Sequence, residues 1–129
     1  MESTVKPSIL IVDDEKSSIN VLAHILRNDY TIFTAKDGKT GLEIAHEFGP
    51  DLILLDIIMP GMDGYQVLSE LKSSTETKNI PVIFVTGLDN TANAMKAPAL
   101  EAADCIYKPF SAANVKEKVD KQIRKSRKK

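Results

Sequence analysis

The stretch DLILLDIIMPGMDG, residues 51–64, decides the fold of this chain. Its wholly apolar run, Leu52 to Leu55, is too short for a helix that packs on its own, and it predicts a β-strand buried on both faces. Asp56 stands at the carboxyl end of this strand, and turn residues follow from Pro60 to Gly64. Open α/β sheets place their binding and catalytic groups at the carboxyl ends of their strands. Groups elsewhere in the chain that converge on Asp56 are therefore the candidates for function.

Apolar runs of the same kind lie on both sides of this stretch. Ile9 to Val12 and Val82 to Val85 predict two more strands that are covered on both faces. Tyr30 to Ala35 is more polar and predicts an outer strand, and Asp104 to Tyr107 predicts a short fifth strand. The sequence therefore contains five predicted strands, three of them apolar on both faces.

Helical repeats of apolar residues follow each predicted strand. Pro98 interrupts the fourth of these helices, which either breaks near Ala97 or restarts with the proline in its first turn. The first of the five predicted helices ends near Arg27, and the second runs from a turn at Asp37-Gly38 to Gly49. The third follows Gly64, the fourth occupies roughly 90–103, and the fifth begins after a Ser111 cap.

One strand followed by one helix, five times over, is typical of a doubly wound parallel sheet with helices on each face. We therefore predict an α/β fold with a five-stranded parallel sheet, five flanking helices and right-handed crossovers. A chain of 129 residues has the length of a single domain.

Composition narrows the function classes. No run approaches a membrane span, and residues 1–7 lack the apolar core of a signal peptide, so we expect a cytoplasmic protein. Two histidines and the single Cys105 are too few for the usual zinc ligand sets. Residues 121–129 carry six basic and no acidic side chains, whereas residues 1–120 carry 11 basic and 18 acidic ones. The basic tail is interpreted as a solvated helix end or a linker in preference to a nucleic-acid contact.

Polar residues follow four of the five predicted strands. Because the carboxyl ends of parallel strands lie along one edge of a sheet, these residues are expected to converge. Crowded carboxylates repel one another, so either their pKa values rise or a cation sits among them. Carboxylate and backbone oxygens suit Mg²⁺, and a lysine and a threonine suit the oxygens of a phosphoryl group carried by Asp56. The converging residues are Asp13, Asp14, Asp56, Thr86 and Lys108.

Each of these residues also has a plain structural interpretation. Asp13 and Asp14 are acceptable helix caps, Asp56 a loop cap, Thr86 a turn hydroxyl and Lys108 a solvated charge. Each plain interpretation is reasonable alone. Their coincidence at four strand ends favours a shared site.

The chain resembles the response-regulator receiver domains of the chemotaxis-regulator (CheY-like) type over nearly all of residues 6–125. The matching motifs are Ile11-Val12-Asp13-Asp14-Glu15, Leu55-Asp56, Met59-Pro60-Gly61-Met62-Asp63-Gly64, Pro81-Val82-Ile83 through Thr86, and Lys108-Pro109-Phe110.

The resemblance implies the strand order 2-1-3-4-5 and a phosphoryl group accepted by Asp56 from a histidine kinase. It implies Mg²⁺ bound by the Asp14 and Asp56 side chains and by the backbone carbonyl of Ile58, with Asp13 helping through water. Thr86 and Lys108 would then sense and neutralise the phosphoryl group.

The sequence departs from the family pattern on the face that such domains use for signalling, formed by the fourth helix, the fifth strand and the fifth helix. Cys105 stands where the family has Tyr or Phe, Glu101-Ala102 replaces a Gly-Ala pair, and Pro98 disturbs the fourth helix. The phosphorylation motif is complete, whereas the output route is altered. Ile58 and Leu88 are apolar where an attacking water would be oriented, which predicts slow self-dephosphorylation.

The predicted function is a phosphoacceptor signalling switch and not an enzyme, with residues 6–125 as the receiver domain. Residues 126–129 are a basic tail, interpretable as a linker to an output domain. The expected partners are a sensor histidine kinase or phosphotransfer protein, a fused output domain, and a second copy bound through the signalling face. Nucleic acid and membrane are not expected partners. A phosphorylation-independent docking module is the alternative, and a hydrolase of the haloacid dehalogenase type is disfavoured because Ile58 replaces its second Asp.

Overall fold

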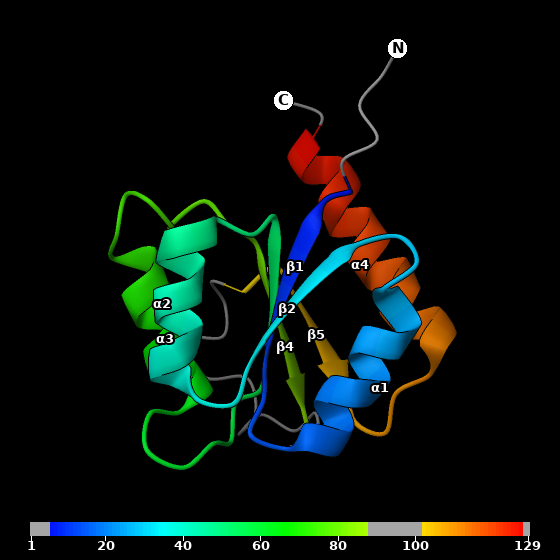
Figure 1. Ribbon diagram of the computed structural model, residues 1–129, viewed down its shortest axis with the longest axis horizontal. Coiled ribbons are helices and arrows are strands. Elements are labelled where there is room, and N and C mark those ends of the chain that lie inside the picture. The colour runs from blue at the N-terminus through cyan, green and yellow to red at the C-terminus, as the bar shows by residue number, and fades with distance from the viewer. Residues whose placement is uncertain (1–5, 88–101, 128–129) are drawn as a thin grey trace.

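The structure, a computed structural model, describes residues 6–87 and 102–127. Its five strands form one parallel sheet, as the sequence predicts, in the order β2-β1-β3-β4-β5 that the resemblance to receiver domains implies. Helices α1 and α4 cover one face, and α2 and α3 cover the other (Figure 1). The elements are β1 (Ser8–Val12), α1 (Lys16–Leu26), β2 (Thr31–Ala35), α2 (Gly38–Phe48), β3 (Leu52–Leu55), α3 (Gly64–Lys72), β4 (Val82–Thr86), β5 (Asp104–Tyr107) and α4 (Ala112–Arg127).

The described residues contain four helices where the sequence predicts five. The remaining predicted helix, roughly 90–103, falls almost wholly within residues 88–101, outside the described part of the chain, and Pro98 lies there too. Helix α4 is therefore the fifth helix of the sequence prediction.

Strand β3 shows why its sequence is a continuous apolar run. Successive side chains of a strand point to opposite faces of the sheet. Leu52 and Leu54 pack with buried residues of α1 and α4, whereas Ile53 and Leu55 pack with those of α2 and α3. Both faces are buried, so every position must be apolar. The prediction of a central, doubly covered strand is confirmed.

Strand β2 lies at one edge of the sheet and is only partly buried, which confirms the outer position predicted from its polar residues. Strand β5 forms the other edge, and Ile106 is its single fully buried residue. Edge strands have a neighbour on one side only, so their sequences tolerate more polar residues than those of β1, β3 and β4.

Helix termini follow the capping residues in the sequence. The Asp37 carboxylate accepts a hydrogen bond of 2.8 Å from the Thr40 backbone N–H, and Gly38 is already the first residue of α2. The predicted turn at Asp37-Gly38 is therefore wrong in detail, because these residues are the N-cap and first turn of the helix. Ser111 caps α4 as predicted, its hydroxyl oxygen accepting from the Asn114 N–H at 3.0 Å.

The connection from β3 to α3 is held tightly against the strand end. Asp63 and Gln66 form a reciprocal capping box at the start of α3. A Cβ atom at Gly64 would lie 2.4 Å from the backbone oxygen of Asp56 and 2.6 Å from the Cα of Ile57. Only glycine permits this approach, so the first turn of α3 fixes the backbone that carries Asp56.

Within residues 6–87 and 102–127, no helix combines the length and the apolar character that crossing a membrane requires.

Candidate functional site

The pairing of β1 with β3 brings two carboxylates together. Val12 lies opposite Leu55 in the parallel ladder, so Asp13 and Asp56 follow at the same level on neighbouring strands. The Asp56 N–H donates to the Val12 carbonyl at 2.9 Å, which continues the ladder up to the site. The sequence prediction that these strand ends converge is confirmed.

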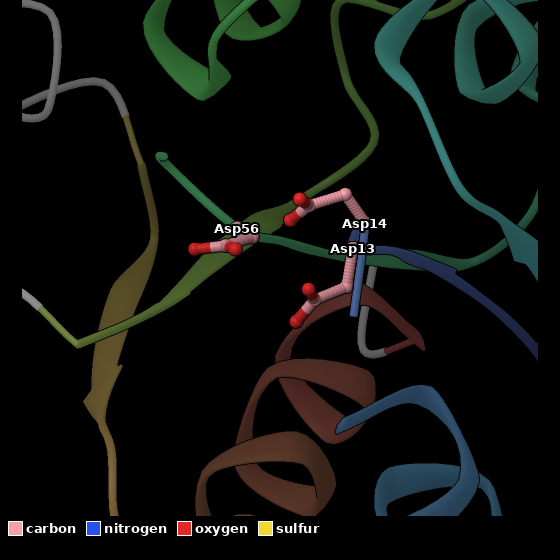
Figure 2. Close-up of side chains that lie close together, drawn as sticks. All are labelled: Asp13, Asp14 and Asp56. Carbon is pink, nitrogen blue, oxygen red and sulfur yellow. The ribbon is translucent and has the colours of Figure 1, made fainter. Parts of the chain in front are cut away.

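Three carboxylates point into a common space beyond the carboxyl ends of the strands (Figure 2). One oxygen from each of Asp13, Asp14 and Asp56 lies within 4.8 Å of the others. Asp13 and Asp56 are 1% and 5% exposed, whereas Asp14 is open to solvent. Two buried carboxyl groups and one exposed carboxyl group therefore share a small volume.

Lys108 joins this group from the end of β5. Its backbone N–H donates to the Thr86 carbonyl at 2.8 Å, and its peptide bond to Pro109 is cis. The Lys108 Nζ lies 3.2 Å from the Asp13 Oδ2 and 3.8 Å from the Asp56 Oδ2. Its side chain is only 20% exposed, so the interpretation of Lys108 as a solvated charge is wrong.

The surroundings of Asp56 change the pKa of its carboxyl group. Burial, and then repulsion from Asp13, raise the pKa of the Asp56 carboxyl to about 7, although Lys108 acts in the opposite direction. Burial of Lys108 works to lower its own pKa, but the attraction of Asp56 and Asp13 outweighs burial and raises it. Burial thus raises the pKa of Asp56 most, and the crowding of carboxylates that the sequence predicts adds to the same shift.

The helix-cap interpretation of Asp13 is wrong, because Asp13 lies two residues before the N-cap of α1. Its Oδ1 accepts a hydrogen bond of 2.9 Å from the Glu15 backbone N–H, while its Oδ2 holds Lys108. The N-cap residue of α1 is Glu15 itself, and its side chain makes no capping hydrogen bond. The Asp13 carboxylate thus binds the backbone before α1 with one oxygen and the Lys108 ammonium with the other.

An open cavity of about 320 Å³ lies above the carboxylates. Ile58 stands at this cavity with 59% of its surface exposed, and its N–H is 3.4 Å from the Asp56 Oδ1. Thr86 ends β4 with its side chain fully buried, and Leu88 lies outside the described residues. The residues that line the cavity are Asp14, Glu15, Asp56, Ile58, Gly87 and Lys108.

Sequence reasoning gave Glu15 no role, although it is part of the matching motif. In the structure its Oε1 lies 3.2 Å from the Lys108 Nζ, and this contact lowers the pKa of the Glu15 carboxyl. A third acid directly after two converging acids was the signal in the sequence. The reach of Lys108 across the site could not be deduced from it, because that reach depends on a rotamer.

Residues 9–120 match the model of the response regulator receiver domain. This match covers most of the chain, so the protein belongs to the response regulator receiver domain family of two-component signalling. The resemblance inferred from the sequence is confirmed.

Among curated proteins, the chain is similar to a probable cyclic di-GMP phosphodiesterase of Vibrio cholerae, with 39% identity over 129 residues. This match takes in all of the chain but only 29% of the relative. The response regulator PleD of Caulobacter vibrioides is 40% identical over 103 residues, which are 79% of this chain and 23% of PleD. The chain thus spans less than a third of either relative.

Among solved structures, the chain is similar to the receiver domain of a signal transduction histidine kinase from Syntrophus aciditrophicus. The identity is 30% and the TM-score 0.84, covering 95% of this chain and 94% of that one. The chemotaxis protein CheY4 of Vibrio cholerae has the same fold, with a TM-score of 0.84 at 24% identity, covering 91% of this chain and 98% of that one.

Proposed function

We propose that this chain is a phosphoacceptor switch and that Asp56 is its acceptor. The observation that carries the proposal is the position of the Asp56 carboxylate, which lines an open cavity beside a lysine ammonium and two further carboxylates. In the reaction, an Asp56 oxygen attacks the phosphorus of a phosphohistidine. The P–N bond breaks, the imidazole leaves and an aspartyl-phosphate forms. The histidine kinase, or a phosphotransfer protein, is the donor that we propose from family membership.

The donor set fits Mg²⁺. Carboxylate oxygens are hard ligands, and a site with few protein ligands leaves the remaining positions to water and phosphoryl oxygens. Asp14 and Asp56 both line the cavity, so their carboxylates would hold the ion together with the Ile58 carbonyl, and Asp13 would act through water. When bound, the ion neutralises negative charge that develops during transfer.

Lys108 and Thr86 are proposed to receive the phosphoryl oxygens. The Lys108 ammonium is already near Asp56 and requires only a small movement to pair with a phosphoryl group there. Thr86 ends the neighbouring strand β4, and we propose that its hydroxyl senses the phosphoryl group on Asp56. This step would relay phosphorylation towards the face that contains β5 and α4.

Slow loss of the phosphoryl group is part of the same proposal. Ile58 presents an apolar side chain at the cavity and cannot orient a water for attack. We expect Ile58→Asn to speed dephosphorylation, measured as decay of the phosphorylated mass after the donor is removed. An unchanged decay would contradict this role of Ile58.

The rest of the assembly is proposed from the relatives. Residues 6–125 would form the receiver domain, and residues 126–129 would belong to a linker towards an output domain. This agrees with matches that span 29% and 23% of their relatives. We propose that the chain itself promotes only its own phosphorylation and dephosphorylation. A homodimer through the β5 and α4 face and a cytoplasmic location stay predictions.

A docking module that works without phosphate is the second candidate. Cys105, in place of the family aromatic, is the observation in its favour. The two candidates differ in one measurement, partner binding with and without phosphorylation. Binding that is equal in both states would favour the docking module.

The direct test is intact mass after incubation with acetyl phosphate. We expect one added phosphoryl group when Mg²⁺ is present, and none when the ion is chelated or when Asp56 is replaced by Asn. A wild-type chain that gains no mass with Mg²⁺ would contradict the proposal.

A further inference from the structure

Lys108 is held by Glu15 as well as by Asp13. Its Nζ donates to the Glu15 Oε1 and to the Asp13 Oδ2, each at 3.2 Å, whereas the Asp56 Oδ2 lies 3.8 Å away. The last distance is an ion pair beyond hydrogen-bond length. The closest contacts of the Lys108 ammonium are therefore with Asp13 and Glu15, which lie just before α1.

Glu15 is placed for this contact by its own hydrogen bonds. Its backbone N–H donates to the Asp13 Oδ1 at 2.9 Å, so Asp13 holds Glu15 and Lys108 with its two oxygens. The Ser18 hydroxyl donates to the Glu15 Oε1 at 3.1 Å. Asp13, Lys108 and Glu15 thus form a closed ring, and the carboxylate of Glu15 is oriented by the first turn of α1.

We propose that Glu15 is a positioning residue that competes with the phosphoryl group for Lys108. This inference rests on the proposed function and assigns a role to a residue of the same cavity. A phosphoryl group on Asp56 attracts the ammonium away from Glu15, so part of the attraction replaces an existing contact. Glu15 thereby weakens the phosphorylated state relative to the free state.

Three variants distinguish the contact between Glu15 and Lys108 from the effect of the Glu15 charge alone. Glu15→Gln keeps the length of the side chain and removes the charge. Glu15→Asp keeps the charge but shortens the side chain away from Lys108, and Asp is a good N-cap for α1. Ser18→Ala removes the hydrogen bond that orients Glu15 and changes no charge. Glu43→Gln, which removes an exposed acid from α2, is the matched control.

Each variant is titrated with beryllium fluoride, a tetrahedral analogue of the phosphoryl group, in the presence of Mg²⁺. Phosphorylation by acetyl phosphate is timed by intact mass in parallel. We expect both Glu15 variants to bind the analogue about two- to fivefold more tightly and to label faster, because an exposed ion pair is lost. Ser18→Ala should move the same way by a smaller factor, and Glu43→Gln should match the wild type.

The outcomes are distinguishable. Glu15→Asp behaving as the wild type while Glu15→Gln binds more tightly would overturn the inference, because charge without contact would then suffice. Equal values for all variants would overturn it as well, with the proposed function intact. A wild-type chain that neither binds the analogue nor takes up phosphate would overturn both.

Discussion

Two regions of the molecule differ in how many carboxylates surround a lysine. One is the site at the ends of β1 and β3, and the other is the junction of β5 with α4. At the site, one ammonium, Lys108, faces the carboxylates of Asp13, Glu15 and Asp56. At the junction, Lys118 faces one carboxylate, Asp104, at 3.1 Å. Charge is therefore in excess at the first region and balanced at the second.

The polar groups at the junction of β5 with α4 are paired with one another. The Lys118 Nζ also donates to the Cys105 carbonyl at 2.7 Å, and the Cys105 N–H donates to the Asp104 carboxylate at 2.7 Å. These bonds tie β5 to α4 without any ligand. Negative charge is thus in excess around Lys108, where a cation would relieve it, while ordinary pairing holds the junction of β5 with α4.

The largest expected effect on phosphorylation comes from removing the shared lysine. Lys108→Met leaves Asp13 and Asp56 without their cation, so we expect a loss of about 2 kcal/mol in the free energy of unfolding at neutral pH. Phosphorylation by acetyl phosphate should slow about 100-fold, because a charged donor to the phosphoryl oxygens is lost. Denaturant unfolding and intact mass measure the two effects.

Lys116→Met is the matched control for this change. Its pair with Asp29 spans 3.4 Å between side chains that are 46% and 54% exposed, so its loss should cost less than about 0.5 kcal/mol. Equal destabilisation by the two substitutions would break the distinction between a crowded site and a balanced surface.

Gly64→Ala tests whether the backbone at Asp56 is fixed by α3. The added Cβ would overlap the Asp56 carbonyl, and we expect about 2 to 3 kcal/mol of destabilisation. A Cβ atom at Gly87 would meet no atom of residues 6–87 and 102–127 within 4 Å, and Gly87→Ala should stay within about 0.5 kcal/mol of the wild type. Thermal or denaturant unfolding of both variants gives the answer, and similar values for the two would contradict the packing described.

Tyr30→Phe tests an anchor of α4 outside both regions. The Tyr30 hydroxyl donates to Asp120, and its loss should cost about 1 kcal/mol. Burial, and then the bond to Asp120, raise the pKa of Tyr30 above its ordinary value of 10.0. The unfolded chain therefore loses the proton first, and this contribution to stability, complete below about pH 10, declines as the pH rises above it.

Unfolding measured at several pH values checks this sign. The wild type should lose stability between neutral pH and the alkaline range more steeply than Tyr30→Phe. A parallel decline in both proteins would show that Tyr30 does not contribute.

The smallest effect is expected at the junction. Lys118→Met should cost about 0.5 to 1 kcal/mol, since the side chains of Lys118 and Asp104 are 31% and 29% exposed. The phosphorylation rate should stay within about twofold of the wild type, because separate sites act independently. A large change in phosphorylation would show that the two regions are coupled already in the unphosphorylated chain.

The strands and the positions of Asp13 and Asp56 were predictable because apolar runs and strand ends are local in the sequence, whereas the strand order came from the resemblance to receiver domains. The start of α2 was missed, since Asp37-Gly38 reads equally as a turn or as an N-cap with its first helical residue. The role of Glu15 depends on where Lys108 points, which no sequence pattern records. The helix over roughly 90–103 stays a prediction.

Reductive trapping of the acyl phosphate tests the central claim most directly. Borohydride converts an aspartyl-phosphate to homoserine, and peptide mass spectrometry then locates the modified residue. After incubation with acetyl phosphate and Mg²⁺, we predict homoserine at position 56 and at no other aspartate. Homoserine at Asp13 or Asp14 in place of Asp56, or none at all, would contradict the account.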